Sequence, residues 1–371
     1  MFVNRLRKIQ CGAVRLMTLI FKKALYFTPI LFSNWKFRRY LLLPLYKEKN
    51  YSITNDKSVG ERDCSATLLG QKTIVYMVQP ETTFSGGLSD RLRGITSIYA
   101  ECKRQGLPFR IVFEPLRLTD YLAPNRYDWQ ISKEDIIWDV DRCYPCSLLT
   151  FHSDLNNPLQ RFAQKMILRF YIGHRAQQIH VYSNMATEES CFRELFNELF
   201  KPSKELEKQL EYHLEKLGGK GCYISMTFRF RQLLGDFKEG GDVLPAEKRE
   251  EYIQLCIKCV ERIHQQTIGK KILVTADSSL FLDKLYSKIY EDGNSRPSTN
   301  QDWLYIIPGK VVHMGFTFDA DEKVYMKSFV DFFMLSYASV TYQVTDKLLM
   351  NSGFPKRASM LGENQYKEVR L

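Results

Sequence analysis

The stretch YISMTFRFRQLLGDF, residues 223–237, decides the fold of this chain. Its first six residues are mostly apolar, aromatic or β-branched, which predicts a buried strand. Arg229 and Arg231 stand where that strand should end, and a helical pattern begins near Pro245. Ligands of open α/β sheets bind beyond the carboxyl ends of strands, and the planar fork of arginine matches phosphate. The stretch therefore predicts a strand, a cationic loop and a helix around a diphosphate site. An edge strand with solvated arginines is the alternative.

The residues after this stretch keep alternating between strand and helix patterns. A buried strand at 271–276 ends in Asp277-Ser278-Ser279, polar residues that can cap the helix that follows. Further strands are predicted at 303–307, 311–312 and 340–344, and further helices at about 246–267, 320–338 and 347–351. This alternation favours a parallel sheet covered by helices.

A similar pattern lies nearer the N-terminus. The apolar run 73–78 predicts a buried strand, and 109–113 predicts another. Between them, a turn with Gly86 and Gly87 opens a helix that should stop at Gly106. Glycines let a ligand approach the backbone and a helix N-terminus favours anions, although a tight turn without a ligand explains the same residues. The turn is not G-x-G-x-x-G and the chain has no GxxxxGK[ST] loop, which argues against a dinucleotide fingerprint and a P-loop kinase.

The middle of the chain connects these two α/β patterns. We expect a strand at 134–138, a loop around Cys143 and Cys146, and helices at 158–172, 187–200 and 202–217. Gly218 and Gly219 end the last helix and mark a domain boundary. The sequence therefore predicts an α/β protein of two Rossmann-like domains, 73–218 and 219–371, that face a cleft.

The net charge of +11 is concentrated at the N-terminus. Residues 1–47 hold ten Lys or Arg and no Asp or Glu, whereas the remainder has 43 basic and 42 acidic residues. The longest uncharged run within residues 1–47, 24–35, is too short to span a membrane, and interspersed Lys and Arg interrupt any signal-peptide core. We expect a basic amphipathic helical segment on the anionic, cytoplasmic face of a membrane. A basic helix packed on the body is the alternative, and nothing elsewhere supports nucleic-acid binding.

Nine cysteines are scattered along the chain, and this odd number argues for a reducing compartment. Cys256 and Cys259 fall on an apolar helix face and are expected in a core. Cys143 and Cys146 could bind a metal or be redox-active, but zinc would require both pairs to meet. The sequence therefore predicts that these cysteines do not form a metal site.

Four segments resemble three motifs of the fucosyltransferase superfamily, which includes nodulation-factor, core α1,6- and protein O-fucosyltransferases. SGGLSDRLRGI at 85–95 resembles the first motif, and ISMTFRFRQLLGDF at 224–237 resembles the donor-binding motif. DFFMLSYASVTYQV at 331–344 and SGFPKRASML at 352–361 resemble the last conserved block. The resemblance covers about 73–360 in motif order and is closest to bacterial proteins that build surface polysaccharides.

The resemblance implies a GT-B fold and a GDP-sugar donor, such as GDP-fucose, held mainly by the second domain. It also implies inversion at the anomeric carbon, a glycan or lipid-linked glycan acceptor, and no metal or other cofactor. Arg229 matches the arginine that contacts the donor phosphates, but Thr227 replaces the usual His, which leaves Arg231 as a second match. The expected donor-binding residues are Arg229, Arg231, Gly86, Gly87, Asp277, Ser278, Ser352 and Arg357.

Glycosyl transfer needs a stabilised leaving diphosphate and a base for the acceptor hydroxyl. Arg229 and a helix N-terminus can supply the first without a metal. Asp90 and Glu81, on the glycine-rich loop, are the candidate bases. An ordinary role for Asp90 as a helix N-terminal charge or partner of Arg93 fits its position as well.

Two other functions fit parts of the sequence. A metal-dependent GT-A glycosyltransferase would use an Asp-x-Asp pair, and such pairs occur at 139–141 and 319–321. A non-enzymatic, membrane-associated scaffold would use the basic N-terminus and would bind no nucleotide. The sequence identifies neither the acceptor nor the linkage nor the donor sugar.

Overall fold

The computed structural model describes most of the chain after residue 70. The described residues are 71–78, 86–114, 116–139, 142–148, 158–185, 189–237, 242–290, 303–310, 312, 314 and 324–371. The predictions for the basic segment 1–47 and for Glu81 fall outside these residues and stay predictions. Among the helices of the described part, none is long and apolar enough to cross a membrane.

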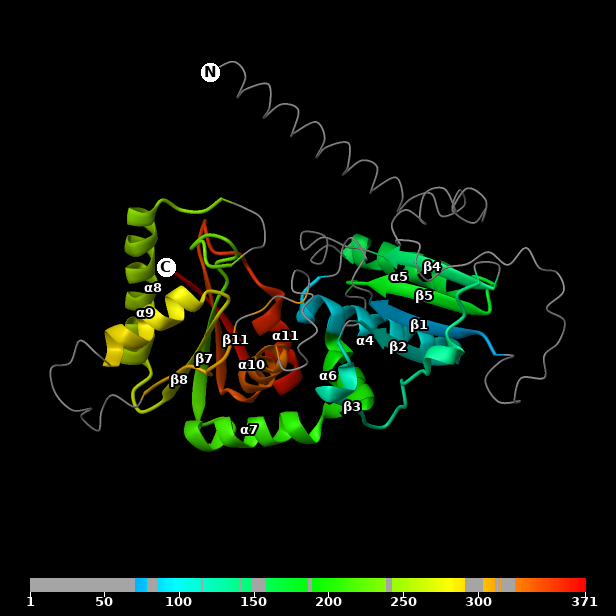
Figure 1. Cartoon of the computed structure of the whole chain (residues 1–371), viewed down its shortest axis with the longest axis horizontal. Helices are drawn as coiled ribbons and strands as arrows, with labels where there is room; N and C mark the ends of the chain where they lie inside the picture. Colours follow the sequence, from blue (N-terminus) through cyan, green and yellow to red (C-terminus); the bar gives the residue numbers. More distant parts are fainter. Residues whose placement is uncertain are drawn as a thin grey trace, which may run out of the picture.

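The first α/β half is built on a four-stranded parallel sheet in the order β2-β1-β5-β4. Its strands are β1 (Thr73–Val78), β2 (Phe109–Phe113), β4 (Cys143–Leu148) and β5 (Gln178–Ser183). All residues of β1 and β5 are buried, as expected for central strands covered on both faces. This half also carries α4 (Leu88–Gln105) and α5 (Pro158–Ile172) (Figure 1).

Helix α4 begins at the glycine-rich turn and lies close to β5. Its N-cap is Gly87, and Gly106 ends it in the left-handed conformation with φ 64°, as the sequence predicts. A Cβ atom at Gly94 would stand 1.6 Å from the carbonyl oxygen of Ser183. Glycine is therefore required at this position for α4 to approach the end of β5.

The second half is built on a five-stranded parallel sheet in the order β11-β10-β7-β8-β9. Its strands are β7 (Tyr223–Phe228), β8 (Lys271–Ala276), β9 (Leu304–Tyr305), β10 (Val340–Thr345) and β11 (Gln365–Arg370). Its helices are α8 (Ala246–Gln266), α9 (Ser279–Tyr290), α10 (Met326–Tyr337) and α11 (Gly353–Gly362). From β7 the chain adds β8 and β9 on one side and then returns to add β10 and β11 on the other side of β7. This is a Rossmann-like strand order, in agreement with the Rossmann-like domain predicted from the sequence.

Short elements connect the two halves. They comprise η2 (Leu118–Asp120), β3 (Leu122–Pro124), η3 (Lys133–Asp135), η5 (Glu189–Cys191), α6 (Phe192–Leu199), β6 (Phe200–Pro202) and α7 (Lys204–Leu217). β3 and β6 pair as a small antiparallel sheet. Ser203 caps α7 through the N–H of Leu206, and Gly218 ends it with φ 83°.

The helices between the two sheets share one hydrophobic core. Figure 1 shows α4 of the first half and the connecting helix α6 beside α10 and α11 of the second half. A single cluster of buried side chains joins residues of β1 and α4 to Phe329, Phe333 and Ala358 of α10 and α11. The two α/β halves therefore meet through a packed helical interface. The division into an acceptor domain and a donor domain stays a prediction.

Several local predictions were wrong, and one concerning the cysteines was confirmed. Residues 134–138 do not form a strand, because Ser132 caps the short η3 helix there. Cys143 and Cys146 lie in strand β4 and are buried, and their odd spacing on a strand points them to opposite faces. Cys256 and Cys259 lie in the core face of α8, as predicted. The helix predicted at 347–351 is absent, and α11 starts at Gly353 instead.

Candidate functional site

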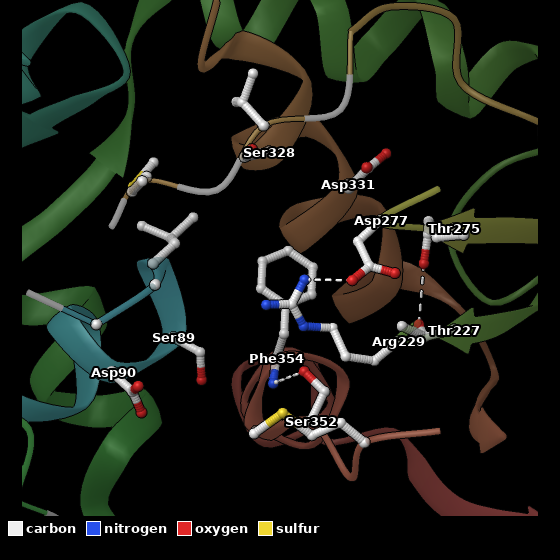
Figure 2. A pocket seen from close by; sticks show the side chains of 18 of the residues that line it. Ser89, Asp90, Thr227, Arg229, Thr275, Asp277, Ser328, Asp331, Ser352 and Phe354 are labelled. Carbon is white, nitrogen blue, oxygen red and sulfur yellow. Dashed lines mark hydrogen bonds and ion pairs between the residues drawn. The ribbon is translucent and has the colours of Figure 1, made fainter. Parts of the chain in front are cut away.

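A pocket of about 330 Å³ lies between the two α/β halves. Figure 2 shows Ser89 and Asp90 of α4 on one side and Arg229 and Asp277 on the other. The lining residues come from six stretches of the chain: Gly86–Asp90; Thr227, Phe228 and Arg229; Thr275, Ala276 and Asp277; Val312 and Met314; Ser328 and Asp331; and Met350, Ser352, Gly353 and Phe354.

The topology of the second sheet explains this position. β7 and β8 end immediately before Arg229 and Asp277, and the chain after β10 leads to Ser352. The pocket therefore lies beyond the carboxyl ends of parallel strands, next to β7 at the centre of the strand order. Ligands of open α/β sheets bind at such a point.

Two helix N-termini face the pocket. Gly87 is the N-cap of α4, and no side-chain hydrogen bond caps this helix in the described part of the chain. Ser352 is the N-cap of α11, and its hydroxyl accepts the N–H of Phe354 at 3.2 Å. Helix N-termini carry partial positive charge and N–H donors, so this pair makes the pocket favourable for an anion.

Arg229 supplies the formal positive charge of the pocket wall. Its Nη1 lies 2.5 Å from Oδ2 of Asp277, and its side chain is 14% exposed. The guanidinium also stands 5.6 Å from the ring centre of Phe237. The side chain is therefore held in one direction by a charge partner and an aromatic ring, and it keeps part of its surface open to the pocket.

Asp277 organises the loop after β7. Its carboxylate accepts the backbone N–H groups of Phe230 and Arg231, each at 2.7 Å, in addition to the contact with Arg229. Burial raises the pKa of Asp277, while Arg229 and the two N–H groups act in the opposite direction. One carboxylate from the end of β8 thus fixes both the backbone and the arginine of the neighbouring loop.

The glycine-rich turn is anchored from two sides. The N–H of Gly86 donates to the Tyr182 hydroxyl at 2.7 Å, and Nε of Arg91 donates to the carbonyl of Gly86 at 2.8 Å. Nη2 of Arg91 also donates to the carbonyl of Met314 at 2.9 Å, on the opposite side of the interface. Arg91 is buried, and burial lowers the pKa of its guanidinium. This residue therefore ties the turn to the second half of the chain.

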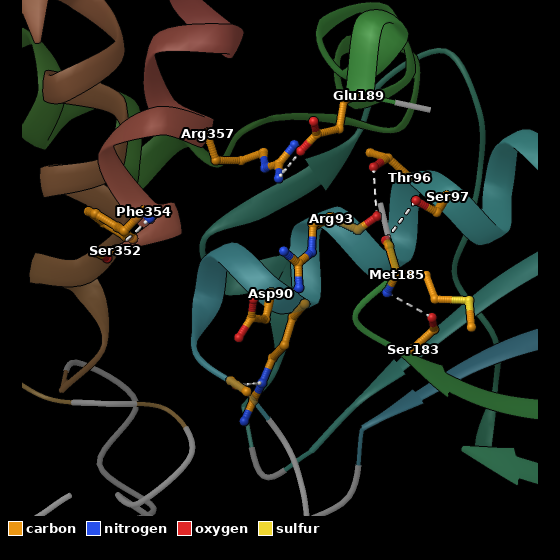
Figure 3. Close-up of polar contacts among 12 residues, drawn as sticks. Asp90, Arg93, Thr96, Ser97, Ser183, Met185, Glu189, Ser352, Phe354 and Arg357 are labelled. Atoms are coloured by element: carbon orange, nitrogen blue, oxygen red, sulfur yellow. Dashed lines mark hydrogen bonds and ion pairs between the residues drawn. The ribbon is translucent and has the colours of Figure 1, made fainter. Parts of the chain in front are cut away.

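Asp90 belongs to a group of buried and half-buried charges at the pocket. Its Oδ1 lies 2.9 Å from Nη2 of Arg93, as the helical spacing suggested. Nearby, Nη2 of Arg357 in α11 donates to Oε1 of Glu189 at 2.9 Å (Figure 3). The Nε atoms of Arg93 and Arg357 are buried and have no hydrogen-bond partner among the described residues. Two arginines and two carboxylates thus lie at the junction between the halves.

Sequence reasoning missed a second ion pair at the pocket. Nζ of Lys327 lies 3.0 and 2.9 Å from the two carboxylate oxygens of Asp331, and both side chains are buried. Burial raises the pKa of Asp331, and Lys327 opposes this shift. The four-residue spacing on an apolar helix was a usable signal, because unpaired charges are rarely buried. Asp331 faces the pocket with Ser328 of the same helix.

The pocket brings together most of the predicted site residues. Gly86, Gly87, Asp90, Arg229, Asp277 and Ser352 all line it. Ser278 does not, because its hydroxyl is held by Asp236 and caps α9 through the N–H of Phe281. Arg357 does not either, because it points away from the N-terminus of α11 toward Glu189 and the ring of Phe192.

Arg231, the second predicted match to the donor-binding arginine, lies outside the pocket lining. Strand alternation would direct Arg229 and Arg231 to the same side if the strand continued through both residues. β7 ends at Phe228, and Arg231 has φ 58°, so these two arginines lie in a turn where strand alternation does not hold. Arg231 does not line the pocket, and the structure leaves Arg229 as the arginine of this motif that does.

The alternative Asp-x-Asp pairs are mostly outside the described residues. Asp139 is described, but Asp141, Asp319 and Asp321 are not. In the described part of the chain, no group of three or more His, Cys, Asp or Glu side chains is arranged to hold a metal ion.

No family model and no curated protein matches this chain. Among solved structures, it is similar to the fucosyltransferase NodZ from Bradyrhizobium, with 14% identity over 78% of this chain and 93% of that chain and a TM-score of 0.47. Arabidopsis thaliana FUT1, mutant R284K in complex with GDP, has 12% identity over 80% and 70% of the two chains and a TM-score of 0.48. POFUT1 in complex with GDP-fucose has 10% identity over 83% and 99% and a TM-score of 0.37. These values describe a remote likeness.

Proposed function

We propose that this protein is a glycosyltransferase that moves a fucosyl group from GDP-fucose to a glycan acceptor. The observation that carries the proposal is the convergence of three sequence motifs on one pocket. Gly86, Gly87 and Asp90 come from the first motif, Arg229 from the second, and Ser352 with Phe354 from the third. These motifs are far apart in the sequence, and the fold brings their residues to one pocket.

The proposed donor binds with its diphosphate between Arg229 and the N-terminus of α11. Arg229 offers a planar fork for two phosphate oxygens, and the helix offers backbone N–H groups. The N-terminus of α4 faces the same space from the first half. Such fixed donors stabilise negative charge that develops on a leaving diphosphate without reorganising during the reaction. The proposed site uses no metal ion.

The proposed reaction is a single displacement at the anomeric carbon. The acceptor hydroxyl loses its proton to a base, its oxygen bonds to the anomeric carbon, and the bond to the β-phosphate breaks. GDP leaves with the electron pair, and the configuration at the anomeric carbon inverts. Asp90 is the proposed base because it lines the pocket on the side opposite Arg229 (Figure 2). Glu81 stays a second candidate from the sequence.

The acceptor and the cellular setting belong to the same proposal. A glycan or lipid-linked glycan in surface-polysaccharide synthesis fits the bacterial proteins that the motifs resemble. The basic segment 1–47 would then hold the enzyme on the cytoplasmic face of the membrane.

A donor screen tests the proposal. Thermal unfolding of the full-length protein is followed with GDP-, UDP-, CMP- and dTDP-sugars, because a ligand that binds only the folded state raises its unfolding temperature. We expect stabilisation by GDP and GDP-fucose, and none by the other three classes. Stabilisation by UDP-sugars alone would overturn the donor assignment, and binding of no nucleotide would favour a scaffold. Activity abolished by EDTA and restored by Mg²⁺ or Mn²⁺ would favour the GT-A alternative.

A further inference from the structure

Helix α5 exposes three large apolar side chains in one row. Phe162, Met166 and Phe170 are 65%, 47% and 40% exposed. Their spacing of four residues places them on one stripe of the helix. Other exposed large apolar residues of the described chain are spread over different elements, such as Ile268 and Tyr286. The opposite side of α5 packs inward through Leu168, Tyr171 and Ile172.

A row of basic side chains runs beside this apolar row. Arg161, Lys165 and Arg169 have the same four-residue spacing, and none of them is buried. Together, Arg161, Phe162, Lys165, Met166, Arg169 and Phe170 make up what we call the α5 face. The sequence from Pro158 to Met185 contains no Asp or Glu. The α5 face is therefore apolar and cationic, with no acidic residue of its own element or the strand after it.

We propose that the α5 face binds the surface of an anionic lipid bilayer. Aromatic and aliphatic side chains beside Lys and Arg are the combination that places a helix in the interface of such a membrane. The apolar row enters the acyl boundary, while the basic row contacts lipid phosphates. An exposed apolar patch of this kind marks a protein or membrane contact, and its positive charge selects an anionic occupant.

Residues 1–47 of the same chain are a poor occupant of this face. They carry ten basic residues and no acidic ones, so like charges would face each other. Instead, the N-terminal segment and the α5 face would bind the same surface. α5 lies at the end of the molecule that carries the first sheet (Figure 1), so this contact would orient that half toward the bilayer. The inference does not rest on the proposed glycosyl transfer.

Vesicle binding by the full-length protein tests the inference. Partitioning is measured on phosphatidylcholine vesicles with and without phosphatidylglycerol, over a range of NaCl concentrations. The double variant Arg161→Gln/Lys165→Gln should weaken binding to the anionic vesicles about 30-fold and reduce its salt dependence. Arg169 is left unchanged, because its Nε lies 3.7 Å from the buried Glu101. Phe162→Ser/Met166→Ser should weaken the same binding by about 10-fold or more.

Matched controls come from other parts of the surface. Lys204→Gln/Lys208→Gln removes the same charge from two exposed positions of α7, and Ile268→Ser removes a side chain that is 90% exposed. Both should change partitioning less than about twofold. The inference is overturned if the α5 variants bind vesicles like the controls while all proteins unfold at the same temperature. Loss of a dimer in the α5 variants, with vesicle binding unchanged, would also overturn it and assign the face to a second copy.

Discussion

Arg357 of α11 donates to Glu189 across the junction between the two α/β halves, with 2.9 Å between Nη2 and Oε1. Both residues stand next to the Asp90–Arg93 pair (Figure 3). Arg357 is 3% exposed and Glu189 21% exposed as side chains. Removing the carboxylate charge would leave a buried guanidinium without its ionic partner, so the pair is expected to hold the halves in register.

The Glu189–Arg357 pair predicts a loss of stability in acid. Burial raises the pKa of Glu189, but Arg357, with smaller contributions from Lys356 and Arg93, lowers it by more, so the pKa lies below its ordinary value. A carboxylate whose pKa is lower in the folded state stabilises it above the unfolded pKa, about 4.3. This contribution is lost as the pH falls through the folded pKa. Glu189→Gln should therefore cost about 1–2 kcal/mol at pH 7.

Urea unfolding at several pH values checks this prediction. Wild type and Glu189→Gln should differ most near neutral pH and converge in acid, where Glu189 is protonated. Glu363→Gln is the control, because its partner Arg193 and Glu363 itself are both well exposed. An equal difference between wild type and Glu189→Gln at every pH would mean that the carboxylate charge does not contribute.

Substitutions of the neighbouring glycines Gly86 and Gly87 are expected to have different effects. A Cβ at Gly86 would lie 2.6 Å from Oδ2 and 2.7 Å from Cβ of Asp90, so Gly86→Ala must displace Asp90. Gly87 has φ −65° and ψ 178°, an extended backbone that alanine also adopts. Gly86→Ala should lower turnover by about 10-fold or more if Asp90 acts on the acceptor.

Gly87→Ala separates folding from ligand contact. We expect an unfolding temperature like that of wild type together with weaker donor binding, because a ligand at the α4 N-terminus would meet the new methyl group. Isothermal titration with GDP measures the affinity. Unchanged affinity and turnover in Gly87→Ala would remove this glycine from the donor site.

Strands rich in apolar and β-branched residues were predictable from the sequence, whereas β5 and β11 were not. β1, β7 and β8 fall at the predicted positions. β5 was missed because it carries Gln178 and His180, which satisfy each other through a 2.6 Å hydrogen bond inside the sheet. β11 was missed because its residues are mostly exposed and polar, as an edge strand allows.

Site residues could be predicted from the sequence where the residue type alone suggests a chemical role. Arg229, Asp277 and the glycine-rich turn were predicted this way, and they line one pocket. Arg91 and the Lys327–Asp331 pair were not identified, since their roles depend on partners brought together by folding. For the same reason, the sequence did not show that Arg357 and Ser278 lie outside the pocket lining. Glu189, the partner of Arg357, and Asp236, the partner of Ser278, are distant from these residues in sequence. Each forms a hydrogen bond with its partner's side chain outside the pocket lining.

Asp90→Asn tests the proposed base. The amide keeps an oxygen for Arg93, so the variant should fold, but it cannot accept the acceptor's proton at neutral pH. Turnover should fall about 100-fold or more while GDP affinity stays within about twofold. Equal turnover in Asp90→Asn and wild type would assign Asp90 to its structural pairing and leave Glu81 to be tested.

Arg229 is the residue on which the proposed donor site depends most. Its guanidinium lies at the pocket wall, 2.5 Å from Asp277, and it should bind the donor diphosphate. Arg229→Lys keeps the charge but loses the bidentate fork, so it should not restore function. Loss of a contact made mainly in the transition state should cost about 3–4 kcal/mol, or ~100- to 1000-fold in turnover.

Arg231→Ala is the matched control, since Arg231 carries the same charge two residues away but does not line the pocket. It should keep turnover within about threefold of wild type, provided that the turn at 230–235 is retained. Arg229→Ala also removes the charge partner of the buried Asp277, so unfolding is measured in parallel and turnover is compared only among folded proteins. A folded Arg229→Ala protein that turns over GDP-fucose like wild type would contradict the proposed diphosphate contact. If Arg231→Ala lost activity instead, the assignment of the two arginines would be reversed.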